Sequence, residues 1–378
     1  MPGNPGSTDV VVVGGGVVGC AAAYYLAGEG LSVTIVERDS VASHASGFAY
    51  GGLTPVMGIY IDDPLVALSA YADELHAELA ESLPELTGVD TEYRAKPSLM
   101  LATRADEVPA IRELYEWLTE HHGGNIGWLE QRELRETEAR LSPDIPAGMF
   151  TDISHEVEPY KFTLALAQAA ESRGAEFRNA QVTGLKLNGG GGVEKVVLGD
   201  DEIAAHDVVL AMGPWSGEVG AWTGIDVPIG PLKGQLLRLA APGDPLAISL
   251  SWSGNYATTK PDGLLWAGTT EEEAGFDENP SAEGRDQIMA SLVKVLPYLA
   301  DARLAQHTAC LRPVAPDGLP IIGQVPNVPG AWLASGTGRK GILLGPGMGR
   351  VVADMIIGKT PEVDVSRLGL ERFSEATD

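Results

Sequence analysis

The stretch DVVVVGGGVVG, residues 9–19, decides the fold of this 378-residue chain. Its apolar part, residues 9–13, is typical of a buried parallel strand, and residues 20–27 are predicted to be helical. The glycines between them fit the pattern G-x-G-x-x-G at Gly14, Gly16 and Gly19. The first glycine permits a tight turn, the second lets backbone approach a pyrophosphate, and the third lets the helix pack on the strand. The pattern predicts a dinucleotide with its phosphates at the N-terminus of the helix.

A carboxylate at the end of the next strand supports this prediction. Residues 32–36 form a second apolar run, and Glu37 follows it, 18 residues beyond Gly19. A carboxylate at this place accepts hydrogen bonds from an adenosine ribose and would repel a 2′-phosphate. Strand, glycine loop, helix, strand and acid together favour a bound dinucleotide over a tight turn without a ligand.

The composition excludes several classes of partner. The formal net charge of −26 repels nucleic acid and anionic lipid headgroups. Two cysteines are too few for a disulfide framework or a zinc site, and no cluster of His, Cys and Asp has metal-ligand spacing, so we expect no metal. No apolar run is long enough to span a bilayer, and we expect a cytoplasmic protein.

The rest of the chain mixes predicted helices and strands. Helices are expected at residues 64–83, 106–121, 160–173 and 281–296. Strands are expected at residues 91–103, 181–187, 193–198, 207–211, 234–239 and 264–267. The four glycines at residues 189–192 are predicted to form a hairpin tip, because no helix follows them.

Four later motifs carry a resemblance to a known family. They are VVLAMGPWS (residues 208–216), GPLKGQ (230–235), LRPVAPDGLPIIG (311–323) and SGTGRKGILLGP (335–346). In their order and spacing the chain resembles the D-amino-acid oxidase superfamily over nearly its whole length, and in particular its glycine oxidases, sarcosine oxidases and D-amino-acid dehydrogenases.

The resemblance implies FAD as the cofactor and an α/β fold of two interleaved domains. A Rossmann-type FAD-binding domain would comprise residues 1–85, 150–225 and 306–378. A smaller substrate-binding domain, built on a mostly antiparallel sheet, would comprise residues 86–149 and 226–305. The residues expected to contact FAD are Gly14, Gly16, Val18, Gly19, Glu37, Arg38, His44, Ser46, Gly51, Gly52, Val182, Ala211, Gly213, Trp215, Cys310, Gly338, Arg339, Gly341, Ile342 and Leu343.

Three residues are expected to act on the substrate. Family members with amino-acid substrates hold the carboxylate with the arginine that corresponds to Arg312, whose planar fork of donors suits a carboxylate; a structural ion pair with a buried acid is the alternative. Lys340 could hold the same carboxylate, stabilise anionic reduced flavin, or be a solvated surface lysine. Tyr256 could contact the substrate through its hydroxyl or pack as a core side chain.

The resemblance also leaves a covalent flavin link open at two places. Cys310 lies where sarcosine oxidases carry a flavin-linked cysteine, and His44 lies where other relatives carry a flavin-linked histidine. The alternatives are an inert buried thiol at Cys310 and a noncovalent contact at His44.

The predicted reaction is oxidation of a small carboxylate-bearing amine by hydride transfer to flavin N5, giving an imine that hydrolyses. Electrons would pass to oxygen or to another acceptor. Oxidation of a 2-hydroxy acid is an alternative that needs a base for the hydroxyl proton. The other alternative is a flavin-holding subunit of a larger complex, and a homo-oligomer also stays open.

Overall fold

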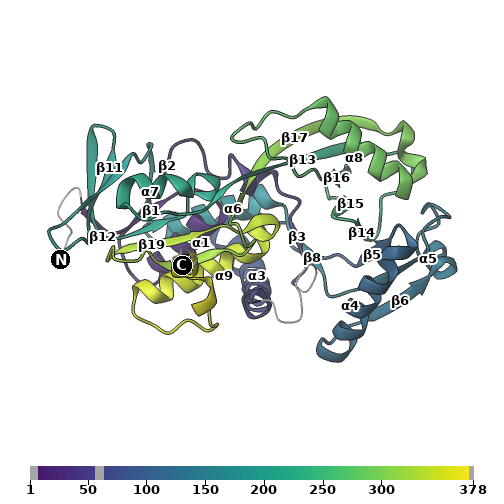
Figure 1. Cartoon of the computed structure of the whole chain (residues 1–378), viewed down its shortest axis with the longest axis horizontal. Helices are drawn as coiled ribbons and strands as arrows, with labels where there is room; N and C mark the ends of the chain where they lie inside the picture. The colour runs from purple at the N-terminus through teal and green to yellow at the C-terminus, as the bar shows by residue number, and fades with distance from the viewer. Residues whose placement is uncertain (1–6, 56–63, 374–378) are drawn as a thin grey trace.

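The computed structural model describes residues 7–55 and 64–373, and it contains two large sheets that stand side by side (Figure 1). Each large sheet has eight strands, and a three-stranded sheet lies between them. The mixture of parallel and antiparallel strands confirms the predicted fold class.

The first sheet, on the left of Figure 1, is built around the N-terminal βαβ unit. Its central strands β12, β1, β2 and β9 are parallel, and β10 and β11 form an antiparallel hairpin at one side. Its strands are β1 (Ser7–Val13), β2 (Val33–Glu37), β9 (Glu176–Asn179), β10 (Gly184–Leu187), β11 (Val193–Leu198), β12 (Asp201–Leu210), β18 (Ile321–Gln324) and β19 (Ala331–Ser335). The predicted tip at residues 189–192 is the turn between β10 and β11.

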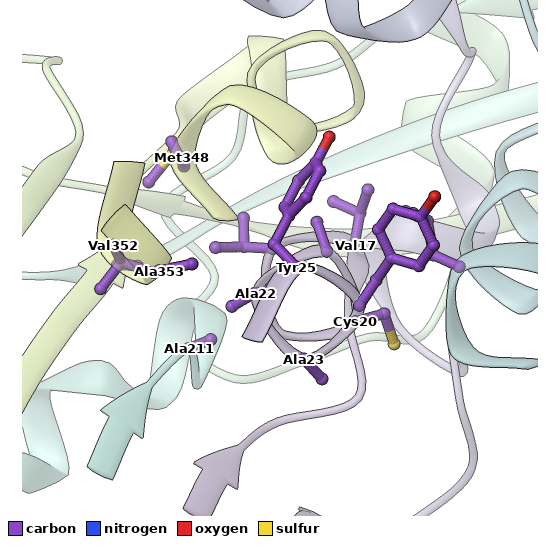
Figure 2. Close-up of a cluster of buried hydrophobic side chains, with 14 of the residues drawn as sticks. Val17, Cys20, Ala22, Ala23, Tyr25, Ala211, Met348, Val352 and Ala353 are labelled. Atoms are coloured by element: carbon purple, nitrogen blue, oxygen red, sulfur yellow. The ribbon is translucent and has the colours of Figure 1, made fainter. Parts of the chain in front are cut away.

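Helix α1 (Val17–Gly28) is buried along almost its whole length, because helices pack on the side that the sheet does not cover. Figure 2 shows its side chains Val17, Ala22 and Tyr25 facing those of α9 (Gly341–Ile356). A Cβ added at Gly349 would lie 2.6 Å from the backbone nitrogen of Ala22. The two helices therefore touch backbone to backbone at this glycine, which holds α1 firmly against α9.

Other helices complete the molecule. α3 and α6 pack with α1 and α9, α8 covers the second sheet, and α4 and α5 flank β6 and β7. Their bounds are α2 (Ala45–Phe48), α3 (Leu65–Thr87), α4 (Val108–His121), α5 (Gln131–Thr137), α6 (Pro159–Ser172), α7 (Val219–Thr223) and α8 (Ala282–Val295). Within the described residues, no helix is both long and apolar enough to cross a bilayer.

The second sheet is antiparallel except for one parallel pair, β5 with β14. Its strands are β5 (Ser98–Ala102), β6 (Ile126–Glu130), β7 (Ala147–Thr151), β13 (Gly230–Ala240), β14 (Ser249–Trp252), β15 (Asn255–Thr259), β16 (Leu265–Gly268) and β17 (Arg303–Val314). Because β7 and β17 belong wholly to this sheet, they cross the domain boundaries that we placed at residues 150 and 306. The division into two domains stays a prediction, and this sheet membership supports moving those boundaries.

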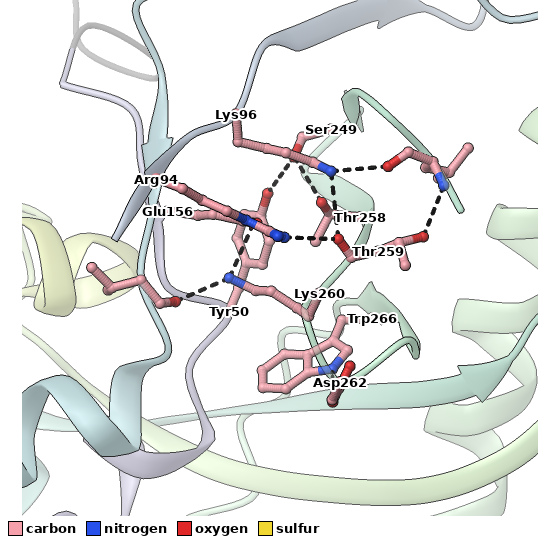
Figure 3. A network of polar contacts seen from close by, with 12 residues as sticks. Tyr50, Arg94, Lys96, Glu156, Ser249, Thr258, Thr259, Lys260, Asp262 and Trp266 are labelled. Atoms are coloured by element: carbon pink, nitrogen blue, oxygen red, sulfur yellow. Dashed lines mark hydrogen bonds and ion pairs between the residues drawn. The ribbon is translucent and has the colours of Figure 1, made fainter. Parts of the chain in front are cut away.

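A buried charge cluster lies at the three-stranded sheet between the two large sheets. The strands of this small sheet are β3 (Gly52–Leu53), β4 (Arg94–Ala95) and β8 (His155–Glu156). Figure 3 shows Arg94 and Lys260 converging on Glu156, whose side chain is 1% exposed. The ammonium of Lys260 lies 3.1 Å from Glu156, and that of Lys96 donates to the carbonyl of Leu246 at 2.9 Å. Removing Glu156 would leave buried cations without a counter-charge, which typically costs about 3–5 kcal/mol.

Candidate active site

A large cavity of about 1090 Å³ lies where the two large sheets meet, and both contribute to its walls. Small-molecule sites typically have volumes of about 300–1,000 Å³. The cavity therefore has room for a large cofactor and a small substrate together.

The glycine loop forms the nucleotide end of this cavity. Gly14 has φ +112°, and a Cβ there would lie 2.3 Å from the carbonyl oxygen of Ala211. The carboxylate of Glu37 accepts from the amides of Gly15 at 2.7 Å and Asp39 at 2.9 Å. These bonds hold Glu37 at the carboxyl end of β2, beside the loop, where a ribose would lie.

The residues present fit FAD. The N-terminus of α1 opens into the cavity, and its backbone amides suit a pyrophosphate. The hydroxyl of Ser46 accepts from the amide of Val17 at 3.0 Å and keeps its own proton available for a phosphate oxygen. Val182 lies at the same end of the cavity.

The structure brings most of the predicted cofactor residues to the cavity wall. Those that line it are Gly14, Gly16, Val18, Glu37, Arg38, His44, Ser46, Gly52, Val182, Ala211, Gly213, Trp215, Cys310, Gly338, Arg339, Gly341 and Ile342. Contact with FAD stays a prediction for each of them.

Three of the predicted cofactor residues are not among those that line the cavity, and for them the structure supports a packing role. A Cβ at Gly19 would lie 2.0 Å from the carbonyl oxygen of Gly14, so Gly19 serves the packing of helix on strand. Gly51 has φ +78° and packs against the carbonyl of Val157, so it sets the path of the chain. Leu343 is 2% exposed and belongs to the apolar core.

His44 joins the two sides of the cavity. Its ring nitrogens lie 2.9 Å from a carboxylate oxygen of Asp39 and 3.0 Å from one of Glu278, and its ring packs edge-on against Trp215. Burial alone would lower the pKa of His44, but the two carboxylates raise it. Since both nitrogens are engaged, the geometry favours the noncovalent role for His44 over a flavin link.

At the other end of the cavity, β17 presents Arg312. One terminal nitrogen of its guanidinium donates to the hydroxyl of Thr269 at 2.7 Å, and the other donates to the carbonyl of Thr270 at 3.1 Å. Within residues 7–55 and 64–373, no carboxylate pairs with Arg312, and a hydroxyl and a carbonyl hold its guanidinium instead. A guanidinium has five N–H donors, so donors remain for a carboxylate ligand.

Two glycines on neighbouring strands make room for the polar side chains at this end. A Cβ on Gly234 of β13 would lie 2.1 Å from a terminal nitrogen of Arg312. A Cβ on Gly268 of β16 would lie 2.5 Å from the hydroxyl oxygen of Tyr256. Both side chains therefore pack directly against the backbone of the sheet at these glycines.

Tyr256 stacks on Tyr50, with ring centroids 4.3 Å apart, and both rings line the cavity. Burial raises the pKa of Tyr256 above its ordinary value, although the nearby Arg312 opposes the shift. The Tyr256 hydroxyl is therefore protonated at neutral pH and can donate a hydrogen bond. The Tyr50 hydroxyl donates to Ser249 at 3.1 Å.

Lys340 and Arg339 lie on the short 3₁₀ turn Gly338–Lys340 that precedes α9, and both line the cavity. Arg339 donates to the carbonyl of Gly254 at 2.7 Å and pairs with Glu271 at 3.0 Å. Cys310 lies two residues before Arg312, and burial raises the pKa of its thiol. The nearby Arg312 opposes this shift, and a thioether link through the Cys310 thiolate stays a prediction.

Sequence reasoning missed the roles of Tyr50, Gly268, Thr269 and Thr270. Gly234 was visible only as part of a motif. Each of these residues matters through a neighbour that is distant in sequence, so no local pattern could have revealed it.

Comparisons with known proteins agree with this geometry. Residues 9–355 match the family described as FAD dependent oxidoreductase. The chain is 32% identical to a glycine oxidase of Pseudomonas aeruginosa over 363 residues, which cover 95% of this chain and 97% of that protein.

Two solved structures are also similar. The crystal structure of glycine oxidase from Geobacillus kaustophilus has a TM-score of 0.92 at 31% identity. The match covers 97% of this chain and 99% of the glycine oxidase chain. The iminodiacetate oxidase of Chelativorans sp. BNC1 has a TM-score of 0.88 at 25% identity and covers 95% of this chain and 98% of its own.

Proposed function

This chain belongs to the FAD-dependent oxidoreductase family, and we propose that it oxidises glycine, sarcosine or a similarly small amino acid at its carbon–nitrogen bond. Family membership and the glycine oxidases among its relatives identify it as an FAD-dependent enzyme that acts on amino acids or amines. The proposal adds the size of the substrate and the residues that bind it.

The observation that carries the proposal is the state of Arg312. Its guanidinium lies on the cavity wall and is held by a hydroxyl and a carbonyl, without a carboxylate partner in the part of the chain that the structure describes. A cation kept there without a counter-charge is stabilised when an anionic ligand binds. A carboxylate fits best, because it accepts two parallel hydrogen bonds from the guanidinium.

The residues of this chain bind and orient the substrate. Arg312 holds the carboxylate, and the protonated hydroxyl of Tyr256 donates a further hydrogen bond. FAD supplies the hydride acceptor when it is bound. The main task of the protein is to hold the reacting carbon in position, which can account for most of the rate enhancement.

A hydroxy acid must lose its hydroxyl proton to a base, whereas an amine needs only its neutral form. Burial raises the pKa of Tyr256, so its hydroxyl is a hydrogen-bond donor and not that base. This role of Tyr256 suits the amine reaction.

The test is anaerobic reduction of the flavin, measured as bleaching, with glycine, sarcosine and glycolate. We expect bleaching by the two amines and release of ammonia or methylamine after turnover. Bleaching by glycolate alone would establish the hydroxy-acid alternative instead.

Arg312→Ala tests the carboxylate contact directly. Its substrate affinity should fall by roughly 2–5 kcal/mol, the usual effect of truncating one partner of a buried charge pair. The FAD content should stay near that of the wild type. Unchanged affinity for glycine and sarcosine would show that Arg312 does not hold the carboxylate.

A further inference from the structure

The cavity has a second guanidinium, and its surroundings differ from those of Arg312. Arg339 pairs with Glu271 at 3.0 Å and donates to the carbonyl of Gly254 at 2.7 Å. Burial and the neighbouring Arg312 both lower the pKa of Arg339, whereas Glu271 raises it. The two guanidinium groups therefore interact, and one of them has a carboxylate partner.

Three consecutive residues create the difference between the surroundings of Arg312 and those of Arg339. Thr269 and Thr270 hold the guanidinium of Arg312, and Glu271, the next residue, pairs with Arg339. Glu271 is not among the residues that line the cavity, whereas Arg339 is. Any effect of Glu271 on a ligand must therefore act through Arg339.

We propose that Glu271 restricts the enzyme to substrates with one carboxylate, by neutralising Arg339 and leaving Arg312 as the guanidinium that receives an anion. This inference rests on the proposed function and names the substrate class more narrowly. Glu271 is a positioning residue. The second carboxylate of a diacid therefore finds at Arg339 a cation that Glu271 already neutralises.

Three further cations on the cavity wall do not alter the difference between Arg312 and Arg339. Arg38 lies at the nucleotide end and pairs with Asp39 at 3.0 Å. The ammonium of Lys96 bonds to the backbone carbonyl of Leu246, on the side of the charge cluster in Figure 3. Lys340 shares the turn of Arg339 and is unchanged in every variant below. A comparison of variants that differ only at residues 271 and 339 therefore isolates this ion pair.

Sarcosine and iminodiacetate are matched probes, because iminodiacetate carries a second carboxylate in place of one methyl hydrogen of sarcosine. We expect the wild type to have a higher kcat/KM for sarcosine than for iminodiacetate. In Glu271→Gln the ratio of kcat/KM for iminodiacetate to that for sarcosine should rise about fivefold, the effect of one unit charge about 4 Å away across water. Because Arg339 is half-exposed, the gain should shrink at high salt.

Two controls separate this effect from a change in overall charge. Glu273→Gln removes the same charge from an exposed residue two positions away, and its ratio should stay at the wild-type value. The double variant Glu271→Gln/Arg339→Gln should lose the gain, because the cation that would bind the second carboxylate is gone. FAD content and Tm should match the wild type in both Glu→Gln variants.

Three results would overturn the inference: an unchanged ratio in Glu271→Gln, an equal rise in Glu273→Gln, or a wild type that uses iminodiacetate as well as sarcosine. Flavin that is not reduced by glycine, by sarcosine or by iminodiacetate would refute the proposed function itself, and this inference with it.

Discussion

Replacing Gly234 by alanine should sharply lower activity without unfolding the protein. The new Cβ would lie 2.1 Å from one terminal nitrogen of Arg312, 2.3 Å from its central carbon and 2.5 Å from the other nitrogen. Carbon contacts are comfortable at about 3.5–4.0 Å, so the guanidinium must move by roughly 1.5 Å. The atoms that must move are the far end of a flexible side chain, so the backbone of β13 can stay in place.

A shift of this size breaks the 2.7 Å hydrogen bond to Thr269 and displaces the carboxylate that Arg312 would hold. Since a 1 Å misplacement can cost about 10²-fold in rate, kcat/KM for the amino-acid substrate should fall about 100-fold. This corresponds to about 2.7 kcal/mol of transition-state stabilisation.

The assay is steady-state turnover beside the FAD-to-protein ratio and Tm. Gly230→Ala is the matched control, because it lies on the same strand and a Cβ there has nothing within 4 Å. The control should keep wild-type kinetics, and both variants should keep FAD and a Tm close to that of the wild type. A Gly234→Ala enzyme with wild-type kcat/KM would refute the placement of Arg312 over this glycine.

Three further predictions concern the cofactor side. Gly14→Ala should purify with little FAD and be destabilised by about 1–3 kcal/mol, because φ is +112° and the Cβ would lie 2.3 Å from the carbonyl of Ala211; a normal FAD-to-protein ratio would contradict this. The pKa of His44 is raised, so its ion pair with Glu278 should stabilise the fold fully below about pH 6.5 and be lost as pH rises through the folded-state pKa. As pH rises from about 6.5 through the folded-state pKa of His44, the Tm of the wild type should therefore fall relative to the Tm of His44→Gln. Parallel Tm profiles of the two proteins would show that the ion pair with Glu278 does not stabilise the fold. Acid precipitation should release the yellow colour from the wild type, because burial raises the pKa of the Cys310 thiol; colour that stays in the pellet and is lost in Cys310→Ala would instead establish a thioether.

The parts of the fold that were predictable are those with strong local patterns. The glycine loop with its flanking strands and helix, and the hairpin at residues 189–192, lie where the sequence placed them. The single strand expected at residues 91–103 is wrong, because Pro97 divides it. Residues 94–95 join the three-stranded sheet, and residues 98–102 join the second large sheet.

Only those residues of the site that belong to sequence motifs could be predicted from the sequence. Arg312 and the cofactor-lining residues belong to stretches with a recognisable order of residue types. The function of Gly268 and Thr269 depends on strand register, since Gly268 lies opposite Leu236 and Tyr256 in the sheet. Register over such distances in sequence is set by the packing of the whole sheet, which no short pattern encodes.

The order of the strands in the two large sheets has a consequence for synthesis on the ribosome. The first sheet takes strands from residues 7–37, 176–210 and 321–335, and the second takes them from residues 98–151 and 230–314. Neither sheet can therefore be completed until most of the chain has left the exit tunnel. The apolar strand β1 emerges first and must wait about 190 residues for its neighbour β12, roughly 10–40 s at ordinary elongation rates. During that interval one edge of β1 has no native neighbour, and this nascent chain is a substrate that chaperones should engage early.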